Sequence, residues 1–488
     1  MDNLRPVVAV LGAILAVFGL TMAVPLAVSW AVADGALRVW PAPMALTVIG
    51  GLALWLPSRR RRRELQPRDG VLLVVLVWSV LPVFASFPLM GWAEQAGRPM
   101  SYTDAYFEAV SGLTTTGATV MTGLDALPAS VNVWRTFLQW QGGMGILILA
   151  VAILPMLGVG GSQLFRAEAA GPLKDTKLTP RITQTAKGLW AVYFVFSLAC
   201  FGAYWAGGMD VLDALKHMFS TVSLGGLSSH DASFGYFESP LLEAVAVFFM
   251  LLCSCNFALY FIAVRKRSLR PAFADPELRA TLFVMLGSAL LVAVVLVLNG
   301  TYAPLQALRH ATFNVISVAS TTGYSTVDYL QWPVFAPAFM LLLSGLATSA
   351  GSTGCGIKMV RLLILLKQAR RELTRIVHPR AVQPVTLGGQ TVGTEVIFAV
   401  LGYMLVYGVS IIGFTMLMLV SEIDLDTAVS AVVASIHCMG PGMGSVGPAG
   451  NYQHLTDYQT WVLSLAMLVG RVELLAFMVL FTPQFWRK

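Results

Sequence analysis

The stretch that decides the fold is Ser111-Gly112-Leu113-Thr114-Thr115-Thr116-Gly117-Ala118-Thr119, a run of small and hydroxyl residues around glycine. Related stretches follow at 223–227 (Ser-Leu-Gly-Gly-Leu), 320–325 (Ser-Thr-Thr-Gly-Tyr-Ser) and 438–442 (Cys-Met-Gly-Pro-Gly). Their central glycines, Gly117, Gly225, Gly323 and Gly440, are 108, 98 and 117 residues apart. Each stretch follows an apolar segment too short to cross a bilayer and precedes one long enough to do so. Four equivalent units can therefore surround one axis.

The composition places the chain in a membrane. Of its 488 residues, 57% are hydrophobic and 12% are charged, whereas soluble proteins carry about 25% charged residues. Basic residues cluster at 59–63, 174–187, 265–270 and 358–380. Because basic loops face the cytoplasm, this pattern predicts an orientation with both termini inside, and it argues against a nucleic-acid partner despite the net charge of +7. The first apolar run, 6–28, is longer than a signal-peptide core of about 7–15 residues, so we expect it to be retained.

We expect an all-α polytopic membrane protein. It has an N-terminal two-helix extension (1–66) followed by four repeats (67–184, 185–271, 272–383 and 384–488), with about ten spans in total. Each repeat is a span, a short pore helix and a second span around one pseudo-fourfold pore. The expected helices are 6–32 and 43–56; 70–92, 102–113 and 133–157; 189–206, 210–222 and 241–264; 278–298, 304–319 and 333–367; 396–420, 424–436 and 461–481. Asp104 is expected as an N-cap or a first-turn acid of the helix at 102–113.

The four glycine stretches are candidate cation ligands. Irregular backbone at membrane depth is tolerated only where protein covers it or where it lines a water-filled cavity. Glycine reaches positive φ at little steric cost, so successive carbonyls can face a common axis and replace an ion's hydration shell. The short helices end at these stretches, and their C-terminal partial negative charge also favours a cation. The filter candidates are Thr115, Thr116, Gly117, Ser223, Leu224, Gly225, Thr321, Thr322, Gly323, Cys438, Met439 and Gly440.

A second constellation interrupts the long run 333–367. Residues 345–356 contain four glycines, each of which costs a helix about 1 kcal/mol relative to alanine. We expect an intramembrane loop that gates the path beneath the filter; a kinked, tightly packed helix is the alternative. The loop also has the GxxxxG spacing of a phosphate loop, but Ile357 occupies the lysine position, so no nucleotide site is predicted. The gate candidates in the loop are Gly345, Thr348, Ser349, Gly351, Ser352, Thr353, Gly354 and Gly356.

Two polar residues lie near these stretches. Arg471 falls near the middle of the expected last span, where an arginine is costly and usually marks a transport path. It cannot share a helix face with Glu473, two residues on, so we expect it to point to the pore or the gate loop; a salt bridge to another helix is the alternative. His437 is expected to form hydrogen bonds behind the fourth stretch, with a pH-sensitive role as the alternative. The five cysteines show no disulfide pattern and are expected to pack as small apolar residues.

At these residues the chain resembles the Trk/Ktr/HKT superfamily of potassium transporters, in particular its TrkH/TrkG-type membrane subunits. The resemblance covers essentially the whole chain, and its further motifs are residues 140–145, 166–168, 179–181, 351–354 and 481–483. It implies potassium and rubidium uptake across the bacterial inner membrane, with K⁺ bound at the filter residues and no covalently bound cofactor. It also implies a homodimer on a cytosolic nucleotide-binding ring of the RCK type. Leu224 and the pair His437-Cys438 depart from the family pattern, so selectivity should be less strict than in a symmetric channel.

Two other classes of function remain as alternatives. An alternating-access cation symporter coupled to protons or sodium would place its site between two inverted halves, whereas the four repeats share one orientation. An enzyme would need a nucleophile with its base or a set of metal ligands, and the six histidines show no such spacing. We therefore expect a gated, channel-like transporter and not an enzyme.

Overall fold

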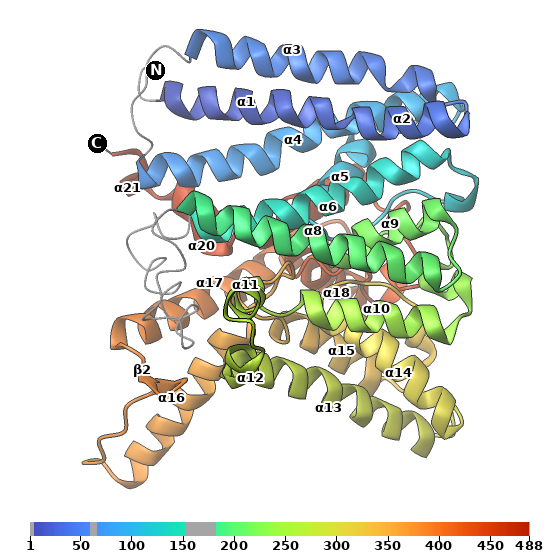
Figure 1. The fold of residues 1–488 in the computed structure, drawn as a ribbon. Coiled ribbons are helices and arrows are strands. Elements are labelled where there is room, and N and C mark those ends of the chain that lie inside the picture. Colours follow the sequence, from blue (N-terminus) through green and yellow to red (C-terminus); the bar gives the residue numbers. More distant parts are fainter. Residues whose placement is uncertain (1–3, 59–65, 153–181, 488) are drawn as a thin grey trace.

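The computed structural model describes residues 4–58, 66–152 and 182–487 and consists almost entirely of helices (Figure 1). The N-terminal helix pair consists of one long helix, α1 (Arg5–Thr21) continued by α2 (Ala23–Val32), and of α3 (Pro41–Ser58). The short helix η2 (Leu37–Val39) lies between α2 and α3. Helix α1 packs on α3 and α4. Glycine permits this close approach, since a Cβ on Gly51 would lie 2.4 Å from the backbone nitrogen of Ala16.

Four groups of three helices follow the N-terminal pair. Their bounds are α4 (Pro67–Gln95), α5 (Tyr102–Leu113) and α6 (Ala129–Ala152); α8 (Ile182–Ala206), α9 (Val211–Val222) and α10 (Pro240–Cys253); α13 (Pro276–Leu298), α14 (Pro304–Ala319) and α15 (Phe335–Leu346); and α17 (Thr394–Leu419), α18 (Leu425–Ile436) and α19 (Asp457–Arg471). Each short middle helix packs on both helices of its own group. It also packs on the third helix of the preceding group, so α9 contacts α6, α14 contacts α10, α18 contacts α15, and α5 contacts α19. The contact between α5 and α19 joins the fourth group to the first, so the four groups form a closed ring.

The remaining elements connect or extend these groups. They are η3 (Leu124–Ala126), η5 (Ser233–Phe237), α11 (Phe257–Lys266), α12 (Arg270–Ala274), η6 (Tyr329–Gln331), α16 (Met359–Val377), η7 (Gly444–Val446), α20 (Leu474–Met478), η8 (Val479–Phe481) and α21 (Pro483–Trp486). Strands β1 (Thr386–Leu387) and β2 (Gln390–Thr391) form an antiparallel hairpin in which Thr386 faces Thr391. The beginning of α1, the end of α16 and α21 all lie on the same side of the helical body (Figure 1).

Side-chain caps fix where three of the four short helices begin. The side chains of Ser101, Asp210 and Asp424 accept hydrogen bonds from the backbone N–H of the third helical residue of α5, α9 and α18. Helix α14 begins at Pro304, whose missing N–H costs nothing at this position. Asp104 is therefore the first-turn acid of α5 and not its N-cap.

Two spans expected to be continuous are broken. The expected helix 241–264 is split into α10 and α11, which meet at 88°, and the expected helix 461–481 turns by 114° between α19 and the segment Leu474–Phe481, which comprises α20 and η8. By length and composition, the described residues contain six helices able to cross a membrane, or up to eight if each bent pair is one span. The count of about ten spans stays a prediction. The basic cluster 59–63, most of the connection 158–187, and the motifs 166–168 and 179–181 lie outside the described residues.

Candidate functional site

The four short helices end with the same backbone geometry. Their C-cap residues are Thr114, Ser223, Ser320 and His437. The next residue is left-handed in every case, with φ of 55° at Thr115, 55° at Leu224, 62° at Thr321 and 51° at Cys438. It donates its N–H to the carbonyl three residues earlier, and its successor donates to the carbonyl five residues earlier, at 2.8–3.1 Å. This is a Schellman motif, in which glycine normally takes the left-handed position.

Four non-glycine residues in the left-handed region form an unusual set. An L-residue in this conformation costs roughly 1–2 kcal/mol. Such strain persists only where the surrounding structure enforces it, and it clusters at functional sites. The four equivalent strained positions therefore identify the ends of the four short helices as the candidate site.

The geometry corrects the predicted alignment of the second stretch by one residue. Two positions after the left-handed residue, Gly117, Gly323 and Gly440 have φ of 82°, 86° and 92°. The residue at that position in the second stretch is Gly226, with φ of 76°, whereas Gly225 has no positive φ. Gly225 is instead equivalent to Thr116, Thr322 and Met439. The sequence could not decide between the two adjacent glycines.

The four stretches lie against one another in a closed ring. A Cβ built on Gly117 would lie 2.1 Å from the carbonyl oxygen of Gly225, and one on Gly226 would lie 1.9 Å from that of Thr322. A Cβ on Gly323 would lie 2.0 Å from the oxygen of Met439. The ring closes at Gly440, whose Cβ would lie 2.7 Å from the oxygen of Thr116. Each of these glycines thus leaves room for a backbone carbonyl of the next stretch.

Hydrogen bonds from side-chain hydroxyls and from one side-chain amide support the backbone of the first three stretches. Thr114 and Thr116 share a hydrogen bond of 2.7 Å between their hydroxyls, and Ser320 and Thr322 share an equivalent one of 2.7 Å. The second stretch has no such pair. Gln139 of α6 donates to the Gly225 carbonyl at 2.6 Å instead, and its side-chain oxygen accepts from Leu227 N–H at 3.2 Å. Sequence analysis missed this role of Gln139.

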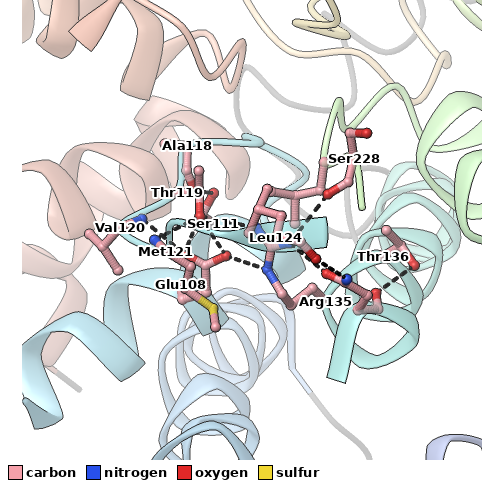
Figure 2. A network of polar contacts seen from close by, with 12 residues as sticks. Glu108, Ser111, Ala118, Thr119, Val120, Met121, Leu124, Arg135, Thr136 and Ser228 are labelled. Carbon is pink, nitrogen blue, oxygen red and sulfur yellow. Dashed lines mark hydrogen bonds and ion pairs between the residues drawn. The ribbon is translucent and has the colours of Figure 1, made fainter. Parts of the chain in front are cut away.

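The ring borders a cavity of about 80 Å³, lined by all four glycine positions together with Arg135, Asp231 and Tyr452. Arg135 belongs to a buried ion pair, shown in Figure 2, in which its Nε donates to Glu108 Oε1 at 2.7 Å. The same carboxylate accepts from Thr119 Oγ1 at 3.0 Å and Val120 N–H at 3.1 Å. Arg135 also reaches the Ser228 carbonyl at 3.3 Å. The pair therefore connects the C-terminal ends of the first two stretches. It was not predicted from the sequence.

A second charged cluster lies between two loops and includes His230, which also lines the cavity. His230 Nδ1 lies 2.5 Å from Asp125 Oδ1, and its Nε2 lies 3.2 Å from Asp213 Oδ2. Burial lowers the pKa of His230, but the hydrogen bonds and charges of Asp213 and Asp125 outweigh it, so the pKa is raised above its ordinary value. The imidazole therefore joins the loop after α5 to the start of α9.

The expected break in the run 333–367 is observed as a loop. Helix α15 ends at Leu346 and α16 begins at Met359. Within the break, Thr348 Oγ1 donates to the Cys355 carbonyl at 2.6 Å, Ser352 donates to the Ser349 carbonyl at 2.6 Å, and Ser349 N–H donates to the Ser254 carbonyl at 2.9 Å. Gly345 accepts from Ile357 N–H at 2.6 Å. The kinked-helix alternative is therefore wrong.

The loop lies directly against the ends of the second and third stretches. Thr353 Oγ1 donates to the Val222 carbonyl at 3.3 Å, and Cys355 N–H donates to Thr321 Oγ1 at 3.3 Å. Gly354 leaves the space for this contact, since a Cβ there would lie 3.1 Å from Thr321 Oγ1. Gly351 and Gly356 have φ of 72° and 91°, so both positions require glycine.

Arg471 connects this loop to the first group of helices. Its Nη1 donates to the Thr353 carbonyl at 2.9 Å and to Cys355 Sγ at 3.2 Å, and its Nη2 donates to the Gly142 carbonyl at 2.9 Å. Arg471 is the last residue of α19, at the break in the expected last span, and it contacts the loop as expected. Glu473 pairs with Arg361 at 3.0 Å instead. His437 bonds to Ser344 at 2.7 Å and to Tyr407, in keeping with the expected role behind the fourth stretch.

The chain is similar to known proteins along most or all of its length. The family model described as "TrkH: Cation transport protein" matches residues 41–488. The chain belongs to the TrkH family. It is 45% identical to the Trk system potassium uptake protein TrkH of Halomonas elongata over the full length of both chains, and 41% identical to that of Escherichia coli, again over both chains in full. It matches the crystal structure of the potassium transporter TrkH from Vibrio parahaemolyticus with a TM-score of 0.91 and 39% identity, over 99% of each chain. TrkH proteins are transporters, so this member is a multi-pass membrane transporter and not an enzyme.

Proposed function

We propose that this protein takes up potassium, and also rubidium, through a gated, channel-like pore. The four stretches around Gly117, Gly226, Gly323 and Gly440 form its filter. The observation that carries the proposal is the closed ring, in which each glycine leaves room for a carbonyl of its neighbour. Backbone carbonyls held in this way can replace the water around an alkali cation. The relatives named as potassium uptake proteins support potassium as the ion.

The proposed filter is not equivalent at its four corners. Two corners carry threonine at the left-handed position, whereas the others carry Leu224 and Cys438. The Gly225 carbonyl accepts a hydrogen bond from Gln139, which competes with any ion for that oxygen. We therefore expect selectivity for potassium over sodium to be weaker than four identical corners would give.

We propose that residues 345–356 and Arg471 form the gate. The loop contacts the second and third stretches, and Arg471 ties it to α6 of the first group. A guanidinium directly beneath the filter also disfavours a cation there while the loop stays in place. Displacement of the loop together with Arg471 would open the path.

The proposed setting is the bacterial inner membrane, with both termini in the cytoplasm. The start of α1, the end of α16 and α21 share one side of the molecule, and α16 carries several arginines (Figure 1). This basic helix and the connection 174–187 are proposed to dock a cytosolic nucleotide-binding ring of the RCK type on a homodimer. The five segments 1–66, 67–184, 185–271, 272–383 and 384–488 remain the proposed organisation.

Tracer uptake tests the proposal. Proteoliposomes containing the full chain should accumulate potassium and rubidium faster than sodium, and Gly323→Ser should abolish the difference. Gly202→Ser is the matched control, because a Cβ on Gly202 meets nothing within 4 Å. Equal uptake by the wild type and Gly323→Ser would refute the filter. A turnover that saturates at low rates would favour the symporter.

A further inference from the structure

Two backbone carbonyls of the ring accept a hydrogen bond from a side chain. Each stretch contributes two carbonyls, one at the glycine with positive φ and one at the residue before it. The Gly440 carbonyl accepts from the phenol of Tyr452 at 2.6 Å, and the Gly225 carbonyl accepts from Gln139. These carbonyls belong to the fourth and second stretches, which stand opposite each other in the ring. Within the described part of the chain no group donates to the other six carbonyls, which belong to Thr116, Gly117, Gly226, Thr322, Gly323 and Met439.

The side chain of Tyr452 is held in place by contacts that do not involve its hydroxyl. The backbone N–H of Tyr452 donates to the Thr119 carbonyl at 2.9 Å. Its ring packs on Phe107 of α5, with 5.4 Å between the ring centroids. The residue is 3% exposed and lines the cavity beside Gly440. Removal of the hydroxyl alone should therefore leave the ring of this side chain in place.

We infer that Tyr452 is a positioning residue that sets ion selectivity through the Gly440 carbonyl, and this inference rests on the proposed function. A carbonyl oxygen that accepts a hydrogen bond presents less of its negative charge to an ion, and the donor fixes its direction. The Gly440 carbonyl is therefore a weaker cation ligand than the carbonyls of Gly117 and Gly323. Potassium is larger than sodium and takes more oxygen ligands, so a weakened ligand penalises potassium more. Tyr452 thus lowers the preference for potassium.

Tyr452 separates this effect from a general disturbance of the filter more cleanly than Gln139 does. The hydroxyl of Tyr452 makes one hydrogen bond within the described residues, the bond to Gly440. Gln139 also accepts from the Ser220 hydroxyl at 2.6 Å and from Leu227 N–H at 3.2 Å. Replacement of Gln139 would therefore disturb the second stretch at three points, whereas Tyr452→Phe changes one contact.

The test compares the uptake of two ions by Tyr452→Phe and the wild type. Proteoliposomes containing the full chain are supplied with tracer potassium or sodium, and initial rates are measured. The ratio of potassium to sodium uptake should rise about two- to tenfold in Tyr452→Phe, the factor that one neutral hydrogen bond supplies. Tyr106→Phe is the matched control, because this buried phenol donates to a carbonyl outside the ring, that of Ser79, at 3.1 Å. Its ratio should equal that of the wild type.

A second readout reports ion binding without transport. Thermal unfolding in detergent is followed in potassium, sodium or choline chloride at equal ionic strength, since an ion that binds the native state raises the midpoint. The midpoint in potassium should exceed that in sodium by more for Tyr452→Phe than for the wild type. An equal excess in both proteins would overturn the inference.

The outcomes distinguish this inference from the alternatives. A hydroxyl that only braces the loop would slow the uptake of both ions equally when it is removed, so an unchanged or lower uptake ratio in folded Tyr452→Phe would also overturn the inference. Absence of potassium uptake by the wild type would instead count against the proposed function. The comparison of unfolding midpoints would then still decide whether Tyr452 affects ion preference.

Discussion

Replacing Gly226 with alanine tests both the ring and the corrected alignment. The new Cβ would lie 1.9 Å from the carbonyl oxygen of Thr322, while real Cβ contacts stay beyond 3.0 Å. The second and third stretches must therefore separate by about 1.1 Å at this point. An L-residue at φ of 76° adds roughly 1–2 kcal/mol of backbone strain.

The expected functional loss follows from that displacement. A misplacement of about 1 Å in a site that depends on exact geometry can cost about 100-fold in rate. We expect rubidium uptake by Gly226→Ala in proteoliposomes to fall to about 1% of the wild-type rate by this reasoning. Gly225→Ala should be less damaging, because its Cβ meets the Gln139 side chain, which can move, and not a backbone carbonyl.

Two controls make the result interpretable. Gly202→Ala lies on α8 with open space around the position, so its uptake should equal that of the wild type. Thermal unfolding in detergent shows whether each variant is folded. Near-normal uptake by a folded Gly226→Ala protein, or a larger loss from Gly225→Ala, would refute the alignment and with it the proposed ring of carbonyls.

Three further predictions concern the charged groups around the ring. Arg471→Gln should raise basal uptake several-fold, because charge-assisted hydrogen bonds of about 1.5–3 kcal/mol each no longer hold the loop; an unchanged uptake curve would remove Arg471 from gating. Glu108→Gln leaves Arg135 buried without its carboxylate, so about 3–5 kcal/mol of stability should be lost. The unfolding midpoint should then fall by ~4 °C or more. A midpoint within about 1–2 °C of the wild type would contradict this. The raised pKa of His230 means that its ionic contacts stabilise the folded protein fully below about pH 6.5 and lose this effect as pH rises through the raised value. His230→Gln should therefore lower the unfolding midpoint more at pH 6 than at pH 9, and an equal decrease at both would show that the histidine does not titrate as inferred.

The sequence predicts the short helices well because local chemistry sets their limits. The bounds expected for α5 and α14 agree with the structure at both ends. A capping serine or a first-position proline starts each of these helices, and a hydroxyl-rich stretch ends it. The loop at 345–356 was predictable for a similar reason, since four glycines among small polar residues strongly disfavour a helix within an apolar run.

The breaks at α10–α11 and α19–α20 were not predictable from apolar content, which continues across both. In the first break Asn256 caps α11 by accepting from Ala258 N–H at 2.9 Å, a signal that one polar residue in an apolar run gives only weakly. Pairings such as Glu108 with Arg135, or Gln139 with Gly225, depend on which segments meet in space. Hydrophobic periodicity carries no such information. The only hint of the ion pair in the sequence is that Glu108 and Arg135 are charged residues within apolar segments.

Carrying all four corners on one polypeptide has a genetic consequence. In a homotetramer, any substitution at the helix end appears four times and must be tolerated at every corner at once. Here Thr115, Leu224, Thr321 and Cys438 occupy the same left-handed position, yet each can change alone. A residue such as Cys438 can thus be gained or lost at one corner without a change of residue at the other three.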